Sequence, residues 1–355
     1  MTILKIRGGD LDLVEYDFNS FHPGENMNTC GLEKSYSITP TQHTVKTQAP
    51  GRIHLTVLDM NRFAPGHPGG GGIGFAIDVF AEVEVSCIEK GYEIKYSRPA
   101  IIRHFLLVFS KVVGYTGGFS VSAKDHDYKH VGLGSTSTIL TALSAAVNRA
   151  LGDPLTLDQL RILIGNNYVE ETEEGMIAYG FETGVGPAVS GRGGMAILGD
   201  NLTVVHQHAF AEGKHVHIVI PPSSISSAGE EEFSLLMNKA RSLDYRDREL
   251  KAYIVMMDFI PALNQEDLKK MGDHMWEMEF RGSKRAEIEH HSFELYQYMH
   301  KLRKAGLEFI GMSSVGPSIA VITDMSRDKL TSILTPLQLE IAVSTKVNNS
   351  GLVYL

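Results

Sequence analysis

The sequence predicts an α/β protein, with an α+β two-layer arrangement, built in two parts. From about residue 47 to 205, strand-like and helix-like segments alternate, and from about 206 onward several segments with helical periodicity lie between short strands. The 355 residues are enough for two domains with large buried cores. We therefore predict an extension over residues 1–46, a first domain over 47–205 and a second domain over 206–355.

The first domain is predicted to open with two strands separated by a glycine cluster. Residues 47–59 alternate in polarity and are rich in β-branched side chains, which indicates a strand. Gly69 to Gly74 then lead into a second strand over 75–87. A helix over 101–113 and a strand over 118–122 follow.

A loop rich in glycine and hydroxyl side chains precedes the next helix. His130-Val-Gly-Leu-Gly-Ser-Thr-Ser-Thr138 runs into residues 139–151, which are apolar at helical spacing and end at a Gly-Asp-Pro stop signal. A second helix is predicted over 157–172, a glycine-rich loop over 180–194 and a strand over 195–198.

The second domain is predicted to be largely helical. The expected elements are a strand over 215–220, helices over 229–243, 246–263, 265–282 and 285–305, a strand over 319–322, a helix over 326–336 and a strand over 339–345.

Composition excludes several classes of protein. Lys and Arg total 33 against 42 Asp and Glu, and the resulting net charge of −9 argues against a nucleic-acid binder that relies on positive charge. Residues 1–20 are too charged for a signal peptide, and no uncharged apolar run is long enough to span a membrane. Cys30 and Cys87 are too few for a disulfide framework and suit a reducing compartment. We expect a cytoplasmic protein.

The loop over residues 130–138 is the strongest candidate for a ligand site. A helix amino terminus has unpaired backbone N–H groups and partial positive charge, and glycines let a phosphate approach them closely. Hydroxyl groups that could bind phosphate oxygens or Mg²⁺ follow at Ser135, Thr136, Ser137 and Thr138. A capped, buried helix after a tight turn explains the same spacing equally well. The lysine of a Walker-type P-loop is missing.

Three glycine-containing motifs occur in an order that resembles the GHMP kinase superfamily. They are Pro50-Gly-Arg-Ile-His54, Gly132-Leu-Gly-Ser-Thr-Ser137 and Gly311-Met-Ser-Ser-Val-Gly-Pro317. The resemblance covers about residues 47–345. It implies the two-part fold of that superfamily, with an amino-terminal half like ribosomal protein S5 domain 2 and a ferredoxin-like carboxy-terminal half.

Other residues resemble the β-ribofuranosylaminobenzene 5′-phosphate synthase branch of this superfamily rather than its kinases. The kinases usually place a catalytic Asp where this chain has Ile177, which cannot accept a proton. The synthase branch uses phosphoribosyl pyrophosphate, and it includes the enzymes that make C-nucleoside antibiotics. The stretches of this chain that match the branch are residues 52–59, 69–77, 178–184 and 313–317.

The resemblance implies roles for individual residues. Asp59 and Glu182 are candidate catalytic groups and Mg²⁺ ligands, and Ser137 is a further candidate ligand of the metal. Arg52 and His54 alternate along one strand face, and a guanidinium at Arg52 suits a carboxylate or a phosphate. The predicted phosphate- and substrate-binding residues are Gly132, Gly134, Ser135, Thr136, Ser137, Thr138, Arg192, Ser313 and Ser314.

Each of these roles has a structural alternative. Asp59 could cap a turn, Arg52 and His54 could be a surface pair, and Glu182 could be a solvated loop acid in a segment too rich in glycine to be core. A charged stripe at Glu277, Arg281, Lys284 and Arg285 could meet an anionic acceptor or simply be solvated. The fifteen histidines form no zinc-binding pattern.

The function that the resemblance implies is decarboxylative C-ribosyl transfer. Such a pentosyltransferase joins phosphoribosyl pyrophosphate to a carbon of an aromatic carboxylic acid with the help of Mg²⁺, releasing pyrophosphate and CO₂. Archaeal synthases typically have Gln and Trp where this chain has Met312 and Val315. That difference favours a pyrazole acceptor in C-nucleoside antibiotic biosynthesis over 4-amino- or 4-hydroxybenzoate in pterin cofactor biosynthesis.

Two other functions are compatible with the same motifs. One is an ATP-dependent small-molecule kinase of the GHMP superfamily, with another acid in place of the missing base. The other is a non-catalytic member that binds ligands. In each case the expected partners are small molecules, without nucleic acid or membrane, and a homodimer is left open.

Overall fold

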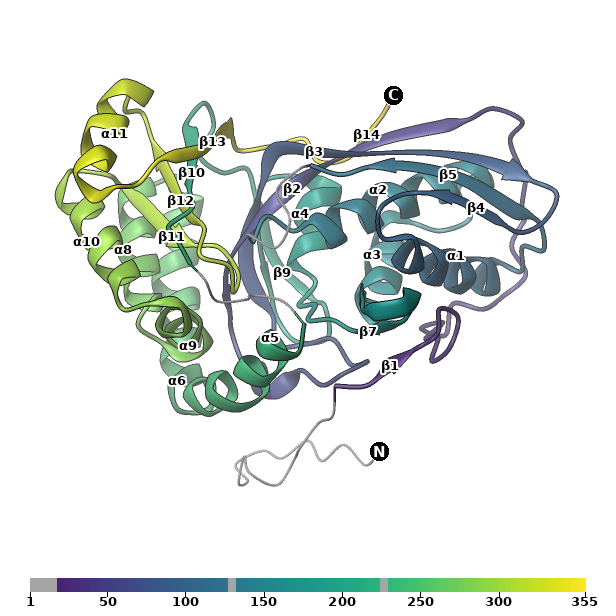
Figure 1. Ribbon diagram of the computed structural model, residues 1–355, viewed down its shortest axis with the longest axis horizontal. Helices are drawn as coiled ribbons and strands as arrows, with labels where there is room; N and C mark the ends of the chain where they lie inside the picture. The colour runs from purple at the N-terminus through teal and green to yellow at the C-terminus, as the bar shows by residue number, and fades with distance from the viewer. Residues whose placement is uncertain (1–17, 127–131, 224–228) are drawn as a thin grey trace.

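Two lobes lie side by side along the long axis of the computed structural model, which describes residues 18–126, 132–223 and 229–355 (Figure 1). The first lobe contains a large sheet with helices on one face, and the second contains a smaller sheet with most of the remaining helices. This arrangement confirms the predicted two-part α/β architecture. No helix in the described residues is long and apolar enough to cross a membrane.

The large sheet has seven strands and carries the first motif. Two long antiparallel strands, β2 and β3, run through its centre. Its strands are β2 (Val45–Val57), β3 (Gly72–Ile88), β4 (Tyr92–Lys95), β5 (Gly118–Lys124), β8 (Met195–Leu198), β9 (Val204–His208) and β14 (Val353–Tyr354). Because β9 belongs to this sheet and β14 returns to pair with β2, both ends of the predicted second domain contact the first lobe.

Three helices pack against this sheet, α1 (Pro99–Val113), α2 (Ser135–Ala150) and α4 (Val185–Arg192), and α3 (Leu157–Asn166) packs on α2 and α4. The glycine cluster before β3 allows α4 to approach closely. A Cβ atom on Gly74 would lie 2.4 Å from the Ile53 carbonyl oxygen and 2.7 Å from a methyl group of Val185. Only glycine leaves room for the backbone of β2 on one side and α4 on the other.

Residues of the predicted extension form part of a third, small sheet. β1 (Ser20–Phe21) pairs antiparallel with β7 (Ile177–Tyr179), which pairs with β6 (Val169–Glu171). Phe21 is buried in the main core of the first lobe. The described part of the extension is therefore attached to the fold through both backbone pairing and side-chain burial.

The second lobe contains a four-stranded antiparallel sheet in the order β11, β12, β10, β13. These strands are β10 (His215–Val219), β11 (Phe309–Met312), β12 (Ile319–Thr323) and β13 (Ile341–Lys346). The helices α8 (Leu268–Met278), α10 (Glu294–Lys304) and α11 (Arg327–Leu334) contribute to the two cores around this sheet, and α9 (Gly282–His291) lies nearer the first lobe (Figure 1).

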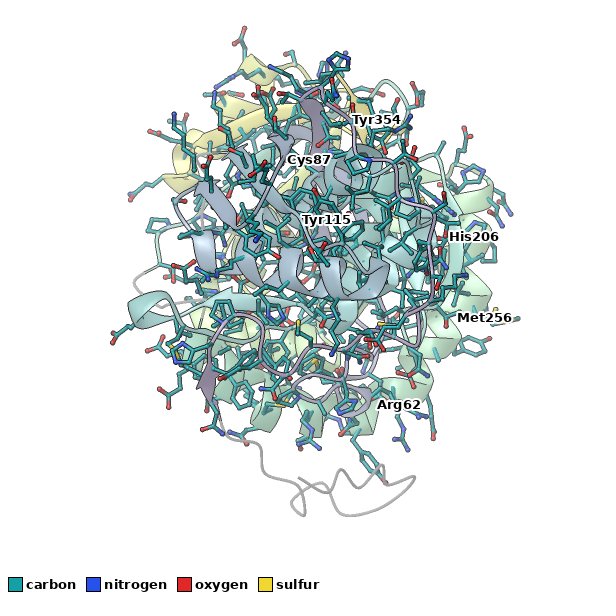
Figure 2. All side chains as sticks on the ribbon, turned by 90° about the vertical axis from the view of Figure 1, so that its right-hand side faces the viewer. Arg62, Cys87, Tyr115, His206, Met256 and Tyr354 are labelled. Atoms are coloured by element: carbon teal, nitrogen blue, oxygen red, sulfur yellow. The ribbon has the colours of Figure 1, made fainter. Side chains whose placement is uncertain are left out.

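The helical run that starts at residue 229 is more continuous than the sequence predicts. It consists of α5 (Gly229–Leu235), η4 (Leu236–Ala240), α6 (Arg241–Tyr253), η5 (Ile254–Phe259) and α7 (Ile260–Asn264), with η4 and η5 as π-helical turns. The predicted break near residue 244 is wrong. Apolar side chains along this run are not all buried: Met256 is 58% exposed and projects outward in Figure 2.

Two further predictions of local structure are wrong. The helix predicted over 157–172 ends at Asn166, because the chain then extends to form β6. The glycine-rich stretch 180–194 is not a loop throughout, since residues 185–192 form α4. There the glycines serve close packing: a Cβ on Gly186 would lie 2.5 Å from the Ser137 hydroxyl oxygen of α2.

Neither cysteine of this chain forms a disulfide. Cys30 and Cys87 are free thiols, and burial raises the pKa of Cys30 to about 11. Cys87 interacts with the Tyr115 hydroxyl, and Figure 2 labels both residues on the first lobe. Their environment gives no sign of a reactive thiolate.

Candidate active site

A cavity of about 340 Å³ is lined by residues from both lobes. From the first lobe come β2, the loop before α2, the small β1–β7–β6 sheet and the segment before α4. From the second lobe come α5, α9 and the third motif. A cavity of this size, lined by polar groups and aromatic rings, is typical of a small-molecule site.

The three motifs meet at one edge of this cavity. The Gly132 carbonyl oxygen accepts hydrogen bonds from the Arg52 guanidinium at 2.9 Å and from the Ser313 hydroxyl at 2.5 Å. The Ser314 backbone N–H donates to the His54 carbonyl oxygen at 2.7 Å. The motifs, which lie far apart in the sequence, thus form a single hydrogen-bonded unit.

The second motif is shaped by its glycines. Gly132 has a φ of +89°, and a Cβ there would lie 2.4 Å from the Ser313 carbonyl oxygen. Gly134 has a φ of +77°, and a Cβ there would lie 2.8 Å from the Arg52 side chain. Both glycines line the cavity, and α2 begins immediately afterwards. His130 and Val131, at the start of the predicted loop, lie outside the described residues.

The four hydroxyl residues of this loop divide into two pairs. Ser135 and Thr136, two of the predicted phosphate-binding residues, line the cavity. Ser137 and Thr138 instead donate to the Gly134 carbonyl oxygen, at 3.1 and 2.7 Å. This is the usual backbone bonding of hydroxyl side chains within a helix. The hydroxyls of Ser137 and Thr138 are therefore bonded to the backbone at the start of α2, and neither residue is in the cavity lining.

Arg98 is the main cavity residue that the sequence analysis missed. Its guanidinium donates to the Ser135 hydroxyl at 2.9 Å and to the Thr136 hydroxyl at 2.6 Å, and it pairs with the Asp125 carboxylate at 3.1 Å. Glu170 lies 3.4 Å from the same guanidinium. An Arg before a helix-starting proline has no distinctive local pattern, so only the fold brings it to this loop.

Glu182 is buried at the cavity wall rather than solvated. Its carboxylate accepts a hydrogen bond from the Gly184 backbone N–H at 2.6 Å, where α4 begins. Burial raises the pKa of Glu182 to about 7, although Arg52 and the backbone N–H groups of Thr183 and Gly184 oppose this shift. The expectation of a non-core segment is wrong here because α4 packs against the sheet.

His54 lines the same cavity and is held in place by Thr183. The Nε2 atom of His54 lies 3.2 Å from the Thr183 hydroxyl. Burial, together with Arg52 and Lys284, lowers the pKa of His54 well below its usual value. His54 is therefore neutral, and both Arg52 and His54 face the cavity from one side of β2.

Asp59 and Arg192 do not belong to the cavity lining. The Asp59 carboxylate caps a short 3₁₀ turn by accepting from the Asn61 backbone N–H at 3.0 Å, and it also accepts from the Asn61 side chain. Arg192, at the end of α4, forms an exposed ion pair with Asp158 at 2.7 Å. The structure thus does not bring Asp59, Ser137 and Glu182 together as a metal site.

No cluster of three His, Cys, Asp or Glu residues that could hold a metal occurs within the described ranges. The paired histidines on β9 and β10 lie ring against ring, with centroids 6.0 Å apart in each pair.

The residues of the predicted charged stripe in the second lobe differ in burial. Lys284 is fully buried and pairs with Glu287 at 2.5 Å, and its ammonium also donates to the Ser314 carbonyl oxygen at 3.0 Å. Glu277 and Arg281 form a partly exposed pair, as do Arg285 and Glu289. Only Lys284 of the four predicted residues reaches the third motif, and Glu287 lines the cavity.

One end of the cavity is apolar and aromatic. Phe18, Met60, Phe63, Phe181, Leu236 and Val315 line it. The ring centroids of Phe63 and Phe181 lie 4.7 Å apart. The ring centroid of Phe233 lies 5.9 Å from that of Phe181 and 5.5 Å from that of Phe18. Such a wall suits a flat, apolar ring. We call these residues and Phe233 the aromatic wall.

Replacing Glu182 with Gln is expected to change how stability depends on pH. The wild-type carboxyl keeps its proton in the folded state up to about pH 7, whereas the unfolded chain releases it near its usual pKa of 4.5. The wild type therefore loses stability as pH rises through this window, by roughly 3 kcal/mol. Urea unfolding between pH 4.5 and 8 should show that E182Q lacks this loss. Parallel pH profiles for both proteins would contradict the buried position of Glu182.

Comparison with known proteins agrees with these features. The chain is 26% identical over 300 residues to a β-ribofuranosylphenol 5′-phosphate synthase of Archaeoglobus fulgidus, covering 79% of this chain and 88% of that protein. A synthase of the same name from Methanothermobacter thermautotrophicus is 25% identical over 293 residues, covering 78% of this chain and 87% of that protein. No family model matches the chain.

Solved structures of two other enzymes share the fold of this chain. Homoserine kinase from Cytophaga hutchinsonii superposes with a TM-score of 0.62 at 14% identity, covering 89% of this chain and 99% of that chain. Mevalonate diphosphate decarboxylase from Staphylococcus aureus has the same TM-score at 16% identity, covering 88% of this chain and 98% of that chain. The GHMP fold and the resemblance to the synthase branch are thereby confirmed.

Proposed function

We propose, from the GHMP fold of this chain and its similarity to β-ribofuranosylphenol 5′-phosphate synthases, that it is a pentosyltransferase forming a C-glycosidic bond. The enzyme would join phosphoribosyl pyrophosphate to a ring carbon of an aromatic carboxylic acid. The observation that carries this proposal is one cavity lined both by the glycine-rich loop with two arginines and by the aromatic wall.

The donor fits the polar end of the cavity. The amino terminus of α2, opened by Gly132 and Gly134, offers backbone N–H groups and a partial positive charge to a diphosphate. Arg52 and Arg98 add guanidinium groups, which bind phosphate oxygens in pairs. Pyrophosphate gains negative charge as it leaves, so the same groups stabilise the transition state.

Mg²⁺ is the proposed cofactor, and the donor set fits it. The lining includes the carboxylates of Glu170, Glu171, Glu182, Glu232 and Glu287, whereas phosphoribosyl pyrophosphate is itself strongly anionic. Mg²⁺ usually binds to one or two carboxylates together with substrate phosphates. Glu182, near the start of α2, is the carboxylate we expect to share the ion with the diphosphate, where the ion would neutralise phosphate charge.

The reaction we propose balances without an enzyme nucleophile. The C1–O bond of the donor breaks with its electron pair on pyrophosphate, and a ring carbon bearing the carboxylate forms a bond to C1. The ring–carboxylate bond then breaks, CO₂ leaves and its electron pair restores the aromatic ring. Carboxylates around the cavity favour the positive charge that develops on the ribosyl group, and the walls hold the two reactants in contact.

For the acceptor, the first candidate is a pyrazole carboxylate and the second is 4-hydroxy- or 4-aminobenzoate. Val315 lines the aromatic wall at a position where archaeal synthases typically have Trp, which supports an acceptor different from theirs. Met312 is buried in the core of the second lobe and is not among the lining residues. The similarity to enzymes named for a ribofuranosylphenol product supports the second candidate.

The deciding experiment is incubation with phosphoribosyl pyrophosphate, Mg²⁺ and each candidate acid. We expect equal amounts of pyrophosphate and CO₂, and loss of both products when Mg²⁺ is chelated. Conversion of ATP to ADP with a small alcohol, without pyrophosphate release, would instead indicate a kinase. Binding of either donor without turnover would indicate a non-catalytic protein.

Ile177 is fully buried in β7, which supports the transferase over a kinase with its base at that position.

A further inference from the structure

Glu232 differs from the other carboxylates of the cavity in its lack of a hydrogen-bond or ion-pair partner among the described residues. Glu170 accepts from Thr136, Glu182 accepts from the Gly184 N–H, and Glu287 pairs with Lys284. Within the described part of the chain, Glu232 forms neither a hydrogen bond nor an ion pair. A half-buried carboxyl group that faces a cavity without a partner is suited to bind a ligand.

The position of Glu232 on α5 places it beside the aromatic wall. Leu236 lies four residues later, so both side chains lie on the same face of the helical run, and both line the cavity. Phe233, the next residue, packs against Phe18 and Phe181. Leu236 and Phe233 also belong to one apolar cluster with Met60, Phe63 and Val315. Glu232 is therefore the polar group of α5 at the apolar end of the cavity.

The charges around Glu232 favour a neutral ligand group there. Burial, together with Glu170 and Glu287, raises the pKa of Glu232 to about 8, and Arg52 opposes this shift. At neutral pH the carboxyl group is mostly protonated and can both donate and accept a hydrogen bond. Another anion would meet a cluster of acidic groups, whereas a hydroxyl, amino or azole N–H group would not be repelled.

We propose that Glu232 recognises the acceptor by a hydrogen bond to a hydroxyl, amino or N–H group on its aromatic ring. This proposal rests on the function proposed above. The ring would lie against the aromatic wall with its carboxylate-bearing carbon toward the ribosyl group, and Glu232 would contact its neutral polar substituent. Glu232 thus selects aromatic acids that carry such a substituent over those that do not.

The test compares two pairs of ligands that differ only in the group that Glu232 would contact. The pairs are 4-hydroxybenzoate with benzoate, and pyrazole-3-carboxylate with its 1-methyl derivative. Calorimetric titration is performed with ribose 5-phosphate, pyrophosphate and Mg²⁺ present to fill the donor end. In the wild type we expect the hydrogen-bonding member of at least one pair to bind about tenfold more tightly. In Glu232→Ala this preference should fall to about twofold or less.

Two variants serve as controls for this test. Glu231 is exposed on the same helix, so Glu231→Gln should keep the full preference. Glu232→Gln keeps the shape of the side chain and some hydrogen-bonding capacity, so its preference should be intermediate and its urea unfolding should match the wild type. The Glu232→Gln variant also keeps the test decisive if the Glu232→Ala variant does not fold.

Three results would overturn the proposal. The first is a wild type that prefers the hydrogen-bonding member of neither pair. The second is a Glu232→Ala protein that keeps the preference, and the third is a Glu232→Gln protein whose only change is a higher Mg²⁺ requirement. The last result would make Glu232 a metal ligand. Pyrophosphate release by the wild type is measured separately. Its absence with every acid would reject the proposed function, whereas its presence with an unchanged ligand preference would reject only the role of Glu232.

Discussion

Replacing Asp244 with Ala is expected to lower the free energy of unfolding by about 3–5 kcal/mol, because it leaves a buried charge without its partner. Asp244 and Lys251 are both fully buried, and their side chains lie 2.5 Å apart. The same carboxylate accepts from the backbone N–H groups of Met60 at 2.9 Å and Ser283 at 2.7 Å. It therefore joins the cavity wall at Met60 to the beginning of α9, which carries Lys284 and Glu287.

Urea-induced unfolding followed by circular dichroism would measure this loss. The matched control is Lys269→Ala, which removes the exposed pair of Lys269 and Asp273 on α8 and should cost less than about 1 kcal/mol. In the double variant Asp244→Ala with Lys251→Met, no buried charge remains, so part of the stability should return. Equal, small effects of D244A and K269A would contradict a buried structural ion pair.

Replacing Gly134 with Val is expected to lower donor efficiency, kcat/KM for phosphoribosyl pyrophosphate, roughly a hundredfold, corresponding to about 3 kcal/mol. A β-branched side chain at this position would project toward Arg52. Its Cβ would lie 2.8 Å from the Cγ atom of Arg52. It would both displace Arg52 and prevent an anion from reaching the backbone at the start of α2. Pyrophosphate release at varied donor concentration measures the effect.

A matched glycine separates this effect from general backbone strain. Gly114 ends α1 with a φ of +71°, close to that of Gly134, and a Cβ there would meet no atom within 4 Å. Gly114→Val should therefore lose a similar amount of stability through its unfavourable φ, while donor efficiency stays within about twofold of the wild type. If both variants lose donor efficiency to the same extent, strain alone accounts for the loss and the loop is not the donor site.

The glycine motifs and the main strands could be predicted from the sequence because their signals are local. Alternating β-branched residues predicted β2, and the apolar helical period after Gly134 predicted α2. The resemblance also named Arg52, His54, Gly132 and Ser314 as candidate site residues, and the structure brings these residues together. The alternation and the helical period each reflect the backbone conformation of a short segment. The sequence of that segment largely specifies its conformation.

The elements predicted wrongly were those whose conformation depends on distant packing. Residues 185–192 look like a flexible glycine-rich loop, yet they form α4 because Gly74 and Gly186 allow the helix to approach β2, β3 and α2. Burial of α4 then encloses Glu182, whose pKa rises to about 7. Local propensity carries no information about the surface against which a helix packs.

Local sequence thus specified the glycine-rich loop before α2, the strand that carries Arg52 and His54, and the two-part α/β class of this protein. The partners of its charged groups depended on contacts between segments far apart in the chain. Asp59 caps a short turn, Arg98 reaches the hydroxyls of Ser135 and Thr136, and Glu232 lines the cavity. The sequence offers a charged side chain several possible partners. Only the packing of the two lobes decides which partner lies within hydrogen-bonding distance and which charged groups are removed from water.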